Sequence, residues 1–91
     1  MEAFDWDNGN LQKAQKHGHS PDEIESVFRD EKAVVRADAK HSGIEERFNI
    51  VGKSQAENYL YITFTIRDEK IRPISVRKAK DKEKRAFGYP D

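Results

Sequence analysis

The stretch YLYITFTIR at residues 59–67, followed by IRPISVRK at residues 71–78, decides the fold of this chain. Apolar and polar side chains alternate in the first stretch, and both are rich in β-branched residues, which is the pattern of strands with one buried face. Only three residues separate the two stretches, whereas parallel strands need a crossover of a dozen or more residues. Together they predict an antiparallel hairpin.

The alternation assigns each side chain of the hairpin to one of two faces. The apolar face carries Leu60, Ile62, Phe64 and Ile66. The polar face carries Tyr59, Tyr61, Thr63, Thr65 and Arg67. If a three-residue turn pairs Arg67 with Ile71, the second strand adds Ile74, Val76 and, at the edge, Arg72 to the apolar face. The same pairing adds Pro73, Ser75 and Arg77 to the polar face.

Two helices are expected before the sheet. Asp7 can cap a helix that runs to about His17, with Gly18 as its stop. Ser20 and the proline after it can open a second helix, in which Glu23 completes a capping box.

Two more strands and a last helix complete the expected fold. Short strands are indicated at residues 34–35 and 48–50, and a weakly docked helix at residues 79–87. The order predicts an α+β fold, in which two N-terminal helices pack on one face of a four-stranded antiparallel sheet, followed by a short C-terminal helix.

Composition limits what this chain can be. Of 91 residues, 35% are hydrophobic and 37% are charged, so we expect residues 1–91 to form a single domain with a thin core. The absence of cysteine excludes disulfides and thiolate metal sites. No apolar run approaches the roughly 20 residues of a membrane span, and no export signal opens the chain, which favours a cytoplasmic protein without membrane insertion.

The formal net charge is zero, but residues 67–85 are basic, and a local basic region can attract phosphate groups. On the polar sheet face, Arg47, Arg67 and Arg77 are expected beside hydroxyl groups and Tyr61. Arginine forks grip phosphate oxygens and an aromatic ring can stack on a base, so this face is predicted to bind RNA. Ordinary salt bridges to acidic residues are the alternative for each arginine.

Candidates for acid–base chemistry are less distinct. The chain has three histidines, His17, His19 and His41, and imidazole is the side-chain group most often used as acid or base near neutral pH. The first two flank a glycine and suit the capping of a helix end, and they lack the spacing and third ligand of a metal site. Three glutamates near strand ends could act as a base: Glu45, Glu46 and Glu57. No phosphate-binding glycine loop, serine elbow or Walker-type lysine is present, which excludes nucleotide hydrolysis and acyl transfer.

Six motifs, taken in order, resemble the BrnT family of ribonuclease toxins. They are FDWD at 4–7, KHG at 16–18, the segment 23–28 ending in VF, Arg47 with Gly52, FTIR at 64–67 and RPISVR at 72–77. The last two are the most specific. The resemblance implies a RelE-like fold, RNA cleavage that inhibits translation, and a co-encoded BrnA-like antitoxin that carries a DNA-binding part.

Carried over by position, the resemblance and the sheet pattern together give two sets of candidates. The expected catalytic residues are Arg67, Arg72, Arg77, Glu46 and His17. The expected RNA-binding residues are Arg47, Lys16, Tyr61, Lys78 and Lys80. Many relatives have a longer turn between the last two strands, and an aromatic residue and a histidine where Lys78 and Lys80 stand here, so the general acid is left open.

The expected reaction needs neither metal nor cofactor. The ribose 2′-hydroxyl attacks the adjacent phosphate, and Arg67 and Arg77 hold the charge that develops on its oxygens. Glu46, His17 and Lys16 are all admissible as the base. The alternatives are a catalytically inactive module that binds RNA or docks the antitoxin, and a metal-dependent hydrolase that uses the histidines. Beside RNA and antitoxin, a homodimer within a toxin–antitoxin heterotetramer is a further possible assembly.

Overall fold

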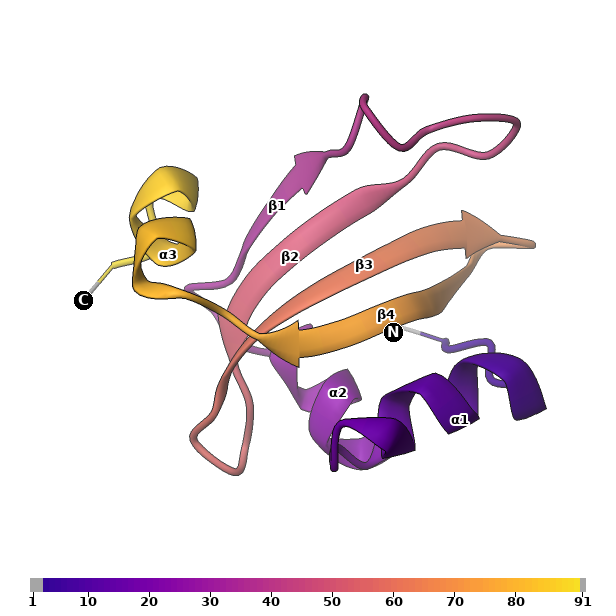
Figure 1. Ribbon diagram of the computed structural model, residues 1–91, viewed down its shortest axis with the longest axis horizontal. Helices are drawn as coiled ribbons and strands as arrows, with labels where there is room; N and C mark the ends of the chain where they lie inside the picture. Colours follow the sequence, from indigo (N-terminus) through magenta and orange to yellow (C-terminus); the bar gives the residue numbers. More distant parts are fainter. Residues whose placement is uncertain (1–2, 91) are drawn as a thin grey trace.

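A four-stranded antiparallel sheet in the order β1-β2-β3-β4 runs through the computed structural model, which describes residues 3–90 (Figure 1). Its strands are β1 (Val34–Ala37), β2 (Phe48–Lys53), β3 (Tyr59–Arg67) and β4 (Lys70–Lys78). Helices α1 (Asn8–Lys16) and α2 (Pro21–Val27) precede the sheet, and α3 (Asp81–Phe87) follows it. The predicted α+β class and element order are confirmed.

Both N-terminal helices begin at the predicted capping residues. Asp7 Oδ1 accepts a hydrogen bond from the Asn10 N–H at 3.1 Å, and Asn10 Oδ1 accepts one from the Asp7 N–H at 2.7 Å. Helix α1 ends before Gly18, whose φ of 79° favours glycine. At α2, Ser20 Oγ accepts from the Glu23 N–H at 3.1 Å, but the second half of the expected capping box is missing because the Glu23 carboxylate makes other contacts.

The buried Glu23 carboxylate ties α2 to the β2–β3 loop. It accepts hydrogen bonds from Ser54 Oγ and Asn58 Nδ2, both at 2.7 Å, and lies 3.0 Å from His19 Nδ1. Burial raises the pKa of Glu23, but the bonds from Asn58, His19 and Ser54 outweigh it and hold this pKa below its ordinary value. His19 is therefore a buried part of this network.

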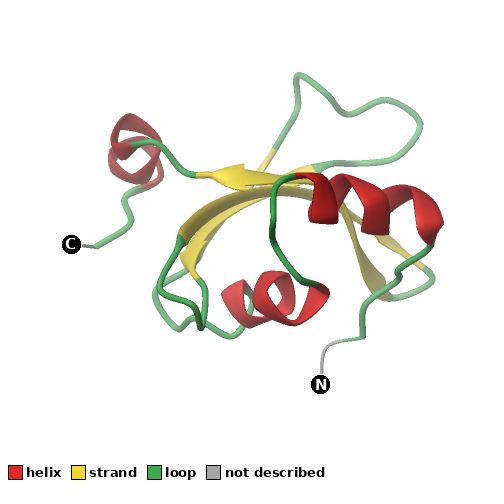
Figure 2. Cartoon of the chain, turned by 60° about the horizontal axis from the view of Figure 1, so that its bottom comes forward, coloured by secondary structure: helices red, strands yellow, loops and turns green. Residues whose placement is uncertain are grey.

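The core lies between one face of the sheet and the two N-terminal helices. Helix α1 runs along β4, α2 lies beneath β2 and β3, and both are on one side of the curved sheet (Figure 2). The buried apolar cluster consists of Ala14, Ile24, Val27, Ile50, Leu60, Ile62, Phe64 and Val76. Ile66 was expected on this face but is 48% exposed, because β3 extends there past the helices.

The β3–β4 hairpin differs from the predicted register. Its turn has two residues, Asp68 and Glu69, with φ of 52° and 64°, so Arg67 pairs with Lys70. Positive φ at both central positions is the geometry that matches the twist of paired strands. Further along, β4 contains one unpaired residue, Ile74, which forms a β-bulge.

This bulge changes which side chains share a face. Arg72 pairs with Thr65, and Pro73 pairs with Phe64. Pro73 is therefore buried on the core side, whereas Arg72 and Ile74 line hollows on the other side. The predicted faces of all three residues were wrong, because a one-residue shift in register inverts every side chain. Beyond the bulge, the predicted pairing of Tyr61 with Arg77 is confirmed.

Segments near both ends of the described chain attach to the rest of the fold. Residues 3–5 run parallel to the start of β4, where the Ile71 N–H donates to the Ala3 carbonyl at 2.8 Å. After α3, buried Tyr89 donates its hydroxyl proton to Asp30 Oδ2 at 2.6 Å, a contact that fixes the C-terminal segment. The last helix was thus expected correctly, but its main attachment was missed. Nowhere in residues 3–90 is a helix long and apolar enough to span a membrane.

Candidate functional site

The sheet face opposite α1 and α2, here called the open face, carries half of the predicted site residues. Cross-strand pairing sets Tyr61 beside Arg77, Thr63 beside Ser75, and Thr65 beside Arg72. Arg47 precedes β2, and its carbonyl continues the ladder by accepting the Asp38 N–H at 2.7 Å. Helix α3 covers one end of this face, where the Phe87 ring meets the Tyr61 ring edge to face.

Three adjoining hollows include Arg47: two lie over the open face and the β1–β2 loop, and the third lies at the β4 edge, where α1 borders the open face. The Arg72 hollow, of about 250 Å³, is lined by Gly9, Asn10, Lys13, Glu45, Arg47, Thr65, Arg67, Arg72, Pro73 and Ile74. The Arg77 hollow, of about 310 Å³, is lined by Asp38, His41, Arg47, Tyr61, Thr63, Ile74, Ser75 and Arg77. The loop hollow, of about 580 Å³, is lined by His41, Gly43, Ile44, Glu45, Arg47 and Arg67.

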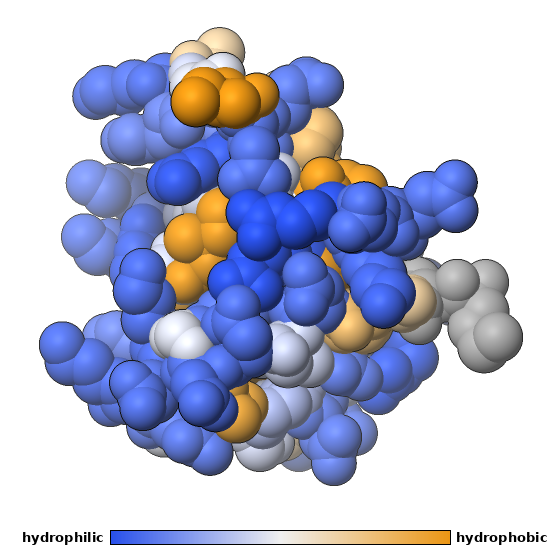
Figure 3. Space-filling model, turned by 90° about the vertical axis from the view of Figure 1, so that its right-hand side faces the viewer, coloured by the Kyte–Doolittle hydropathy of each residue, from blue (hydrophilic) through white to orange (hydrophobic). Residues whose placement is uncertain are grey.

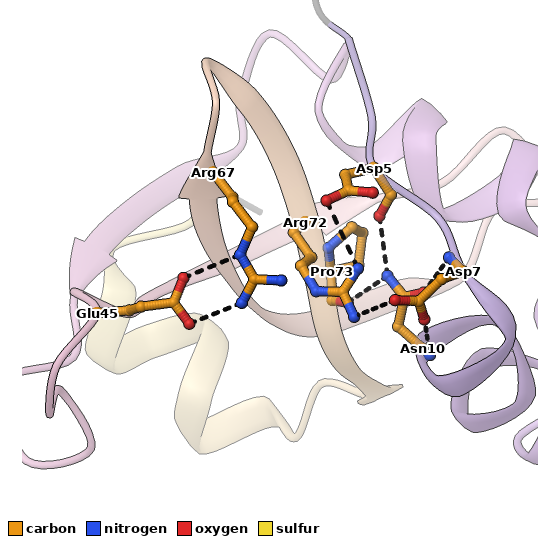
Figure 4. A network of polar contacts seen from close by, with 7 residues as sticks. All are labelled: Asp5, Asp7, Asn10, Glu45, Arg67, Arg72 and Pro73. Carbon is orange, nitrogen blue, oxygen red and sulfur yellow. Dashed lines mark hydrogen bonds and ion pairs between the residues drawn. The ribbon is translucent and has the colours of Figure 1, made fainter.

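Arg67 makes a two-pronged pair with Glu45 (Figure 4). Its Nε and Nη2 atoms donate to the two Glu45 oxygens at 3.2 and 2.9 Å. The hydrogen bond from Arg67 lowers the pKa of Glu45, and the same bond raises the pKa of Arg67. Both side chains are nearly half exposed, so this pair contributes little to stability and is open to exchange with another anion.

Arg72 fastens β4 to the start of α1. Its Nη2 donates to Asp7 Oδ2 at 2.6 Å, and its Nη1 lies 3.6 Å from Asp5 Oδ2 (Figure 4). Beside it, Asn10 Nδ2 donates to the Asp5 and Pro73 carbonyls at 3.0 and 2.9 Å. Only 17% of the Arg72 side chain is exposed. Its two carboxylate partners make Arg72 a structural link in the free protein.

Arg77 is held by an acid and a ring. Its Nη1 and Nη2 donate to the Glu83 carboxylate at 2.8 and 2.5 Å, and its guanidinium lies 4.3 Å from the centre of the Tyr61 ring. The bonds from Arg77 lower the pKa of Glu83 to about 2. Burial and the nearby Glu83 charge raise the pKa of Tyr61, so its phenol is protonated near neutrality.

Arg47 differs from these three arginines. It is half-buried at the point where the hollows meet, and within residues 3–90 it forms no ion pair. A fifth arginine on the same face, Arg36, lies over the Phe87 ring at 5.3 Å and was missed because the register of β1 could not be read from its few residues. Of the four arginines that line the three hollows, Arg47 is thus the one without an ion pair in the described part of the chain.

An aspartate–histidine pair faces the Arg77 hollow. His41 Nδ1 lies 3.1 and 3.0 Å from the two carboxylate oxygens of Asp38. Burial raises the pKa of Asp38, but bonds from Asn49 and His41 outweigh it and hold this pKa below its ordinary value. Sequence reasoning named His41 without a partner, because the pair forms in an irregular loop between β1 and β2. Its spacing of three residues was the available signal.

Five predicted residues lie away from the three hollows. Glu46 is exposed and faces a separate hollow with Phe48 and Ile66. Lys16 and His17 are at the far end of α1, about 12 Å along the helix from its start beside Arg72. The other two are Lys78, which pairs with Leu60 at the end of β4, and Lys80, which precedes α3. Instead, Lys13 and Glu45 line the Arg72 hollow.

The surface around the β1–β2 loop and the β3–β4 turn is hydrophilic, with small separate apolar patches (Figure 3). Residues 3–90 contain no group of three His, Asp or Glu side chains placed to hold a metal ion. Arg67, Arg72 and Arg77 each form a salt bridge with an acidic residue in the free protein, which was the alternative expected for them. What the open face offers chemically is several guanidinium groups, an aromatic ring and hydroxyl groups around these hollows.

This fold and face define a class of small α+β domains in which one sheet face is covered by helices and the other presents arginines. The family model described as "Ribonuclease toxin, BrnT, of type II toxin-antitoxin system" matches residues 6–83. The chain therefore belongs to the BrnT family, as the motifs indicated. This family consists of ribonuclease toxins of type II toxin–antitoxin systems, so membership implies a cognate antitoxin partner. No match to the sequence was found among curated proteins.

Proposed function

We propose that this protein is a metal-independent endoribonuclease that cleaves RNA bound along the open face and thereby inhibits translation. The observation that carries this proposal is the convergence of Arg47, Arg67 and Arg77 on adjoining hollows of that face, in a chain of the BrnT family. Guanidinium groups supply positive charge at any working pH without a metal ion. Tyr61 adds a ring on which a base can stack.

Arg67 and Arg77 have separate tasks in this proposal. Arg77 lies opposite Tyr61, six residues before Arg67 on β3, so about 20 Å of strand separates their backbones. That spacing suits contacts with different phosphates of one RNA strand. Arg77 and Arg47 share a hollow and are assigned to the phosphate that is cleaved. Arg67 is assigned to a neighbouring phosphate.

Cleavage then proceeds by attack of a ribose 2′-hydroxyl on the adjacent phosphate. Negative charge builds on the phosphorane oxygens, where Arg47 and Arg77 donate hydrogen bonds. For this contact the RNA displaces Glu83 from Arg77, as it displaces Glu45 from Arg67 at the neighbouring site. Both exchanges replace one charge-assisted hydrogen bond by another, so neither leaves an arginine unpaired.

The antitoxin has a physical reason to cover the same face. Phosphate-binding arginines must be blocked in growing cells, and a partner chain that carries acidic or helical groups can do so. We propose a BrnA-like antitoxin with a DNA-binding part, acting in the cytoplasm, as the protein that supplies these groups. A dimer of toxins within a heterotetramer remains one arrangement of that complex.

The test is cleavage of total RNA by purified, antitoxin-free protein in excess chelator, with and without ribosomes. Arg77→Ala and Arg47→Ala are each expected to lower the cleavage rate by about a hundredfold or more. Arg29→Ala is the matched control, because this exposed arginine lies on the helix side of the sheet. Activity that disappears in chelator indicates a metal-dependent hydrolase, and RNA binding without cleavage indicates an inactive binding module.

A further inference from the structure

We propose that His41 accepts the proton of the attacking 2′-hydroxyl and that Asp38 positions the His41 ring, an assignment that rests on the ribonuclease function proposed above. His41 lies in the β1–β2 loop, outside the motifs by which the sequence resembles the family. The structure nevertheless brings it to the hollow that contains Arg77, Arg47 and Tyr61.

The geometry of the pair suits a base that is oriented by a carboxylate. The Asp38 side chain is 13% exposed and holds His41 Nδ1 with both oxygens, at 3.1 and 3.0 Å. The His41 side chain is 61% exposed, so the ring is accessible to a substrate. Because Nδ1 faces Asp38, the Nε2 atom points away from it. A carboxylate on Nδ1 fixes the tautomer in which Nε2 accepts a proton.

Asp38 is itself fixed in the loop. Asp38 Oδ1 also accepts a hydrogen bond from the His41 backbone N–H at 3.2 Å. The Asp38 backbone carbonyl accepts one from the Ser42 hydroxyl at 2.7 Å. The Asp38 N–H bonds the carbonyl of Arg47. The histidine pair and the free arginine are therefore connected through one short segment, which sets their relative positions.

The other acid–base candidates are engaged or distant. Glu45 and Glu83 are bound by Arg67 and Arg77, whose hydrogen bonds lower both carboxyl pKa values. His19 is buried against Glu23. Glu46 and His17 do not line the three hollows of the open face. Among the candidates for a base, His41 alone both lines a hollow with Arg47 and Arg77 and has a carboxylate partner of its own.

The proposed step balances as follows. The 2′-O–H bond breaks and its proton moves to His41 Nε2, while the 2′ oxygen forms a bond to phosphorus. The bond between phosphorus and the 5′ oxygen breaks, and that oxygen takes a proton from water. The products are a 2′,3′-cyclic phosphate and a 5′-hydroxyl end. His41 then returns its proton to solvent.

The first test is His41→Ala with the purified full chain. Loss of a general base is expected to lower the cleavage rate by about 10²- to 10⁴-fold. Added imidazole should restore part of the rate to His41→Ala but not to Arg77→Ala. Circular dichroism verifies folding, which the exposed position of His41 favours. A His41→Ala rate equal to that of wild type overturns the assignment, as does a lost rate that imidazole leaves unchanged.

A second test separates the base from a general acid. A substrate with sulfur in place of the 5′ bridging oxygen releases a leaving group that needs no proton. If His41 is the base, the His41→Ala defect persists on this substrate, and a defect that vanishes overturns the assignment. For Asp38→Asn we expect a kcat lowered by about tenfold or more with KM unchanged, because the ring loses orientation while RNA contacts stay. If Asp38→Asn also lowers the thermal unfolding temperature markedly, the loss of kcat reflects a damaged fold and contradicts this positioning role.

These outcomes distinguish the two proposals. Cleavage that is lost in Arg77→Ala and kept in His41→Ala refutes the role of His41 and leaves the ribonuclease function in place. If wild-type protein cleaves no RNA, with or without ribosomes, both proposals fail together.

Discussion

At Arg77 a single guanidinium group is held on two sides. Its central carbon lies 4.3 Å from the centre of the Tyr61 ring, and its N–H groups bind Glu83 at 2.8 and 2.5 Å. Planar stacking and a fork of donors are properties of arginine that lysine lacks. The same two properties serve a nucleotide, whose phosphate can take the place of Glu83. Under the proposed function, Glu83 therefore competes with RNA for Arg77.

Removing the Glu83 charge should strengthen RNA binding. Glu83→Gln keeps an acceptor for the Lys80 N–H at the start of α3 but no longer neutralises Arg77. We expect the Kd for a non-cleavable 2′-O-methyl oligonucleotide to fall about three- to tenfold, the value of one charge-assisted hydrogen bond shared between competitors. Asp22→Asn, which also removes one negative charge, is the control. Equal effects of the two substitutions would show that only net charge matters.

The same carboxylate gives the fold a pH dependence. The pKa of Glu83 is about 2 in the folded protein, below its ordinary value of 4.5, chiefly through bonds from Arg77. A depressed pKa stabilises the fold above about pH 4.5, and this contribution is lost as the pH falls toward 2. We expect about 1 kcal/mol, because Arg77 is nearly half exposed and solvent screens the pair. Urea unfolding at pH 5 and pH 2.5 should show a smaller loss in Glu83→Gln than in wild type.

At the scale of elements, Gly52 lets α2 approach β2 closely. A Cβ atom there would lie 2.9 Å from Val27 Cγ1 and 3.0 Å from Ala33 Cβ. Gly52→Ala should therefore lower the free energy of unfolding by about 1–3 kcal/mol through overpacking. Gly43→Ala, where a Cβ meets nothing within 4 Å, should leave it nearly unchanged. Urea titration measures both, and a Gly52→Ala variant as stable as wild type would refute the close packing.

Sequence predicted the elements well and the hairpin's details poorly. Alternation in β3 and the caps at Asp7 and Ser20 are local signals, and these were confirmed. The turn has Asp68 and Glu69 at positive φ. Glycine or asparagine at these positions would have indicated a two-residue turn in the sequence, but neither is present. No residue type in the sequence marks the bulge at Ile74. The faces of Arg72, Pro73 and Ile74 were therefore assigned wrongly.

Prediction of the candidate site divides in the same way. Strand parity placed Arg67, Arg77 and Tyr61 on the open face, where the structure has them. The acids that pair with the arginines come from loops and from α3, and their positions depend on tertiary packing that no local pattern encodes. For the same reason, the Asp38–His41 pair could be recognised only once the β1–β2 loop was seen to reach the Arg77 hollow.

For the molecule as a whole, 17 lysines and arginines are balanced by 17 aspartates and glutamates. Its formal net charge of zero gives no long-range attraction for RNA, so recognition depends on local contacts within roughly 8–10 Å. This arrangement suits a toxin that must be restrained: three of the four arginines that line the hollows are paired with acids, and the fourth, Arg47, lies where the three hollows meet. An antitoxin that covers this central position would block all three hollows at once.

The central claim is metal-free cleavage of RNA through its own 2′-hydroxyl, and the chemical ends of the product test it most directly. One labelled oligoribonucleotide is incubated with wild-type protein in excess chelator, beside the same oligonucleotide with a 2′-deoxy residue at the cleaved position. The account predicts a 2′,3′-cyclic phosphate and a 5′-hydroxyl end from the first and no cleavage of the second. Cleavage that requires a divalent metal, or that leaves a 5′-phosphate end and tolerates the deoxy residue, would contradict it.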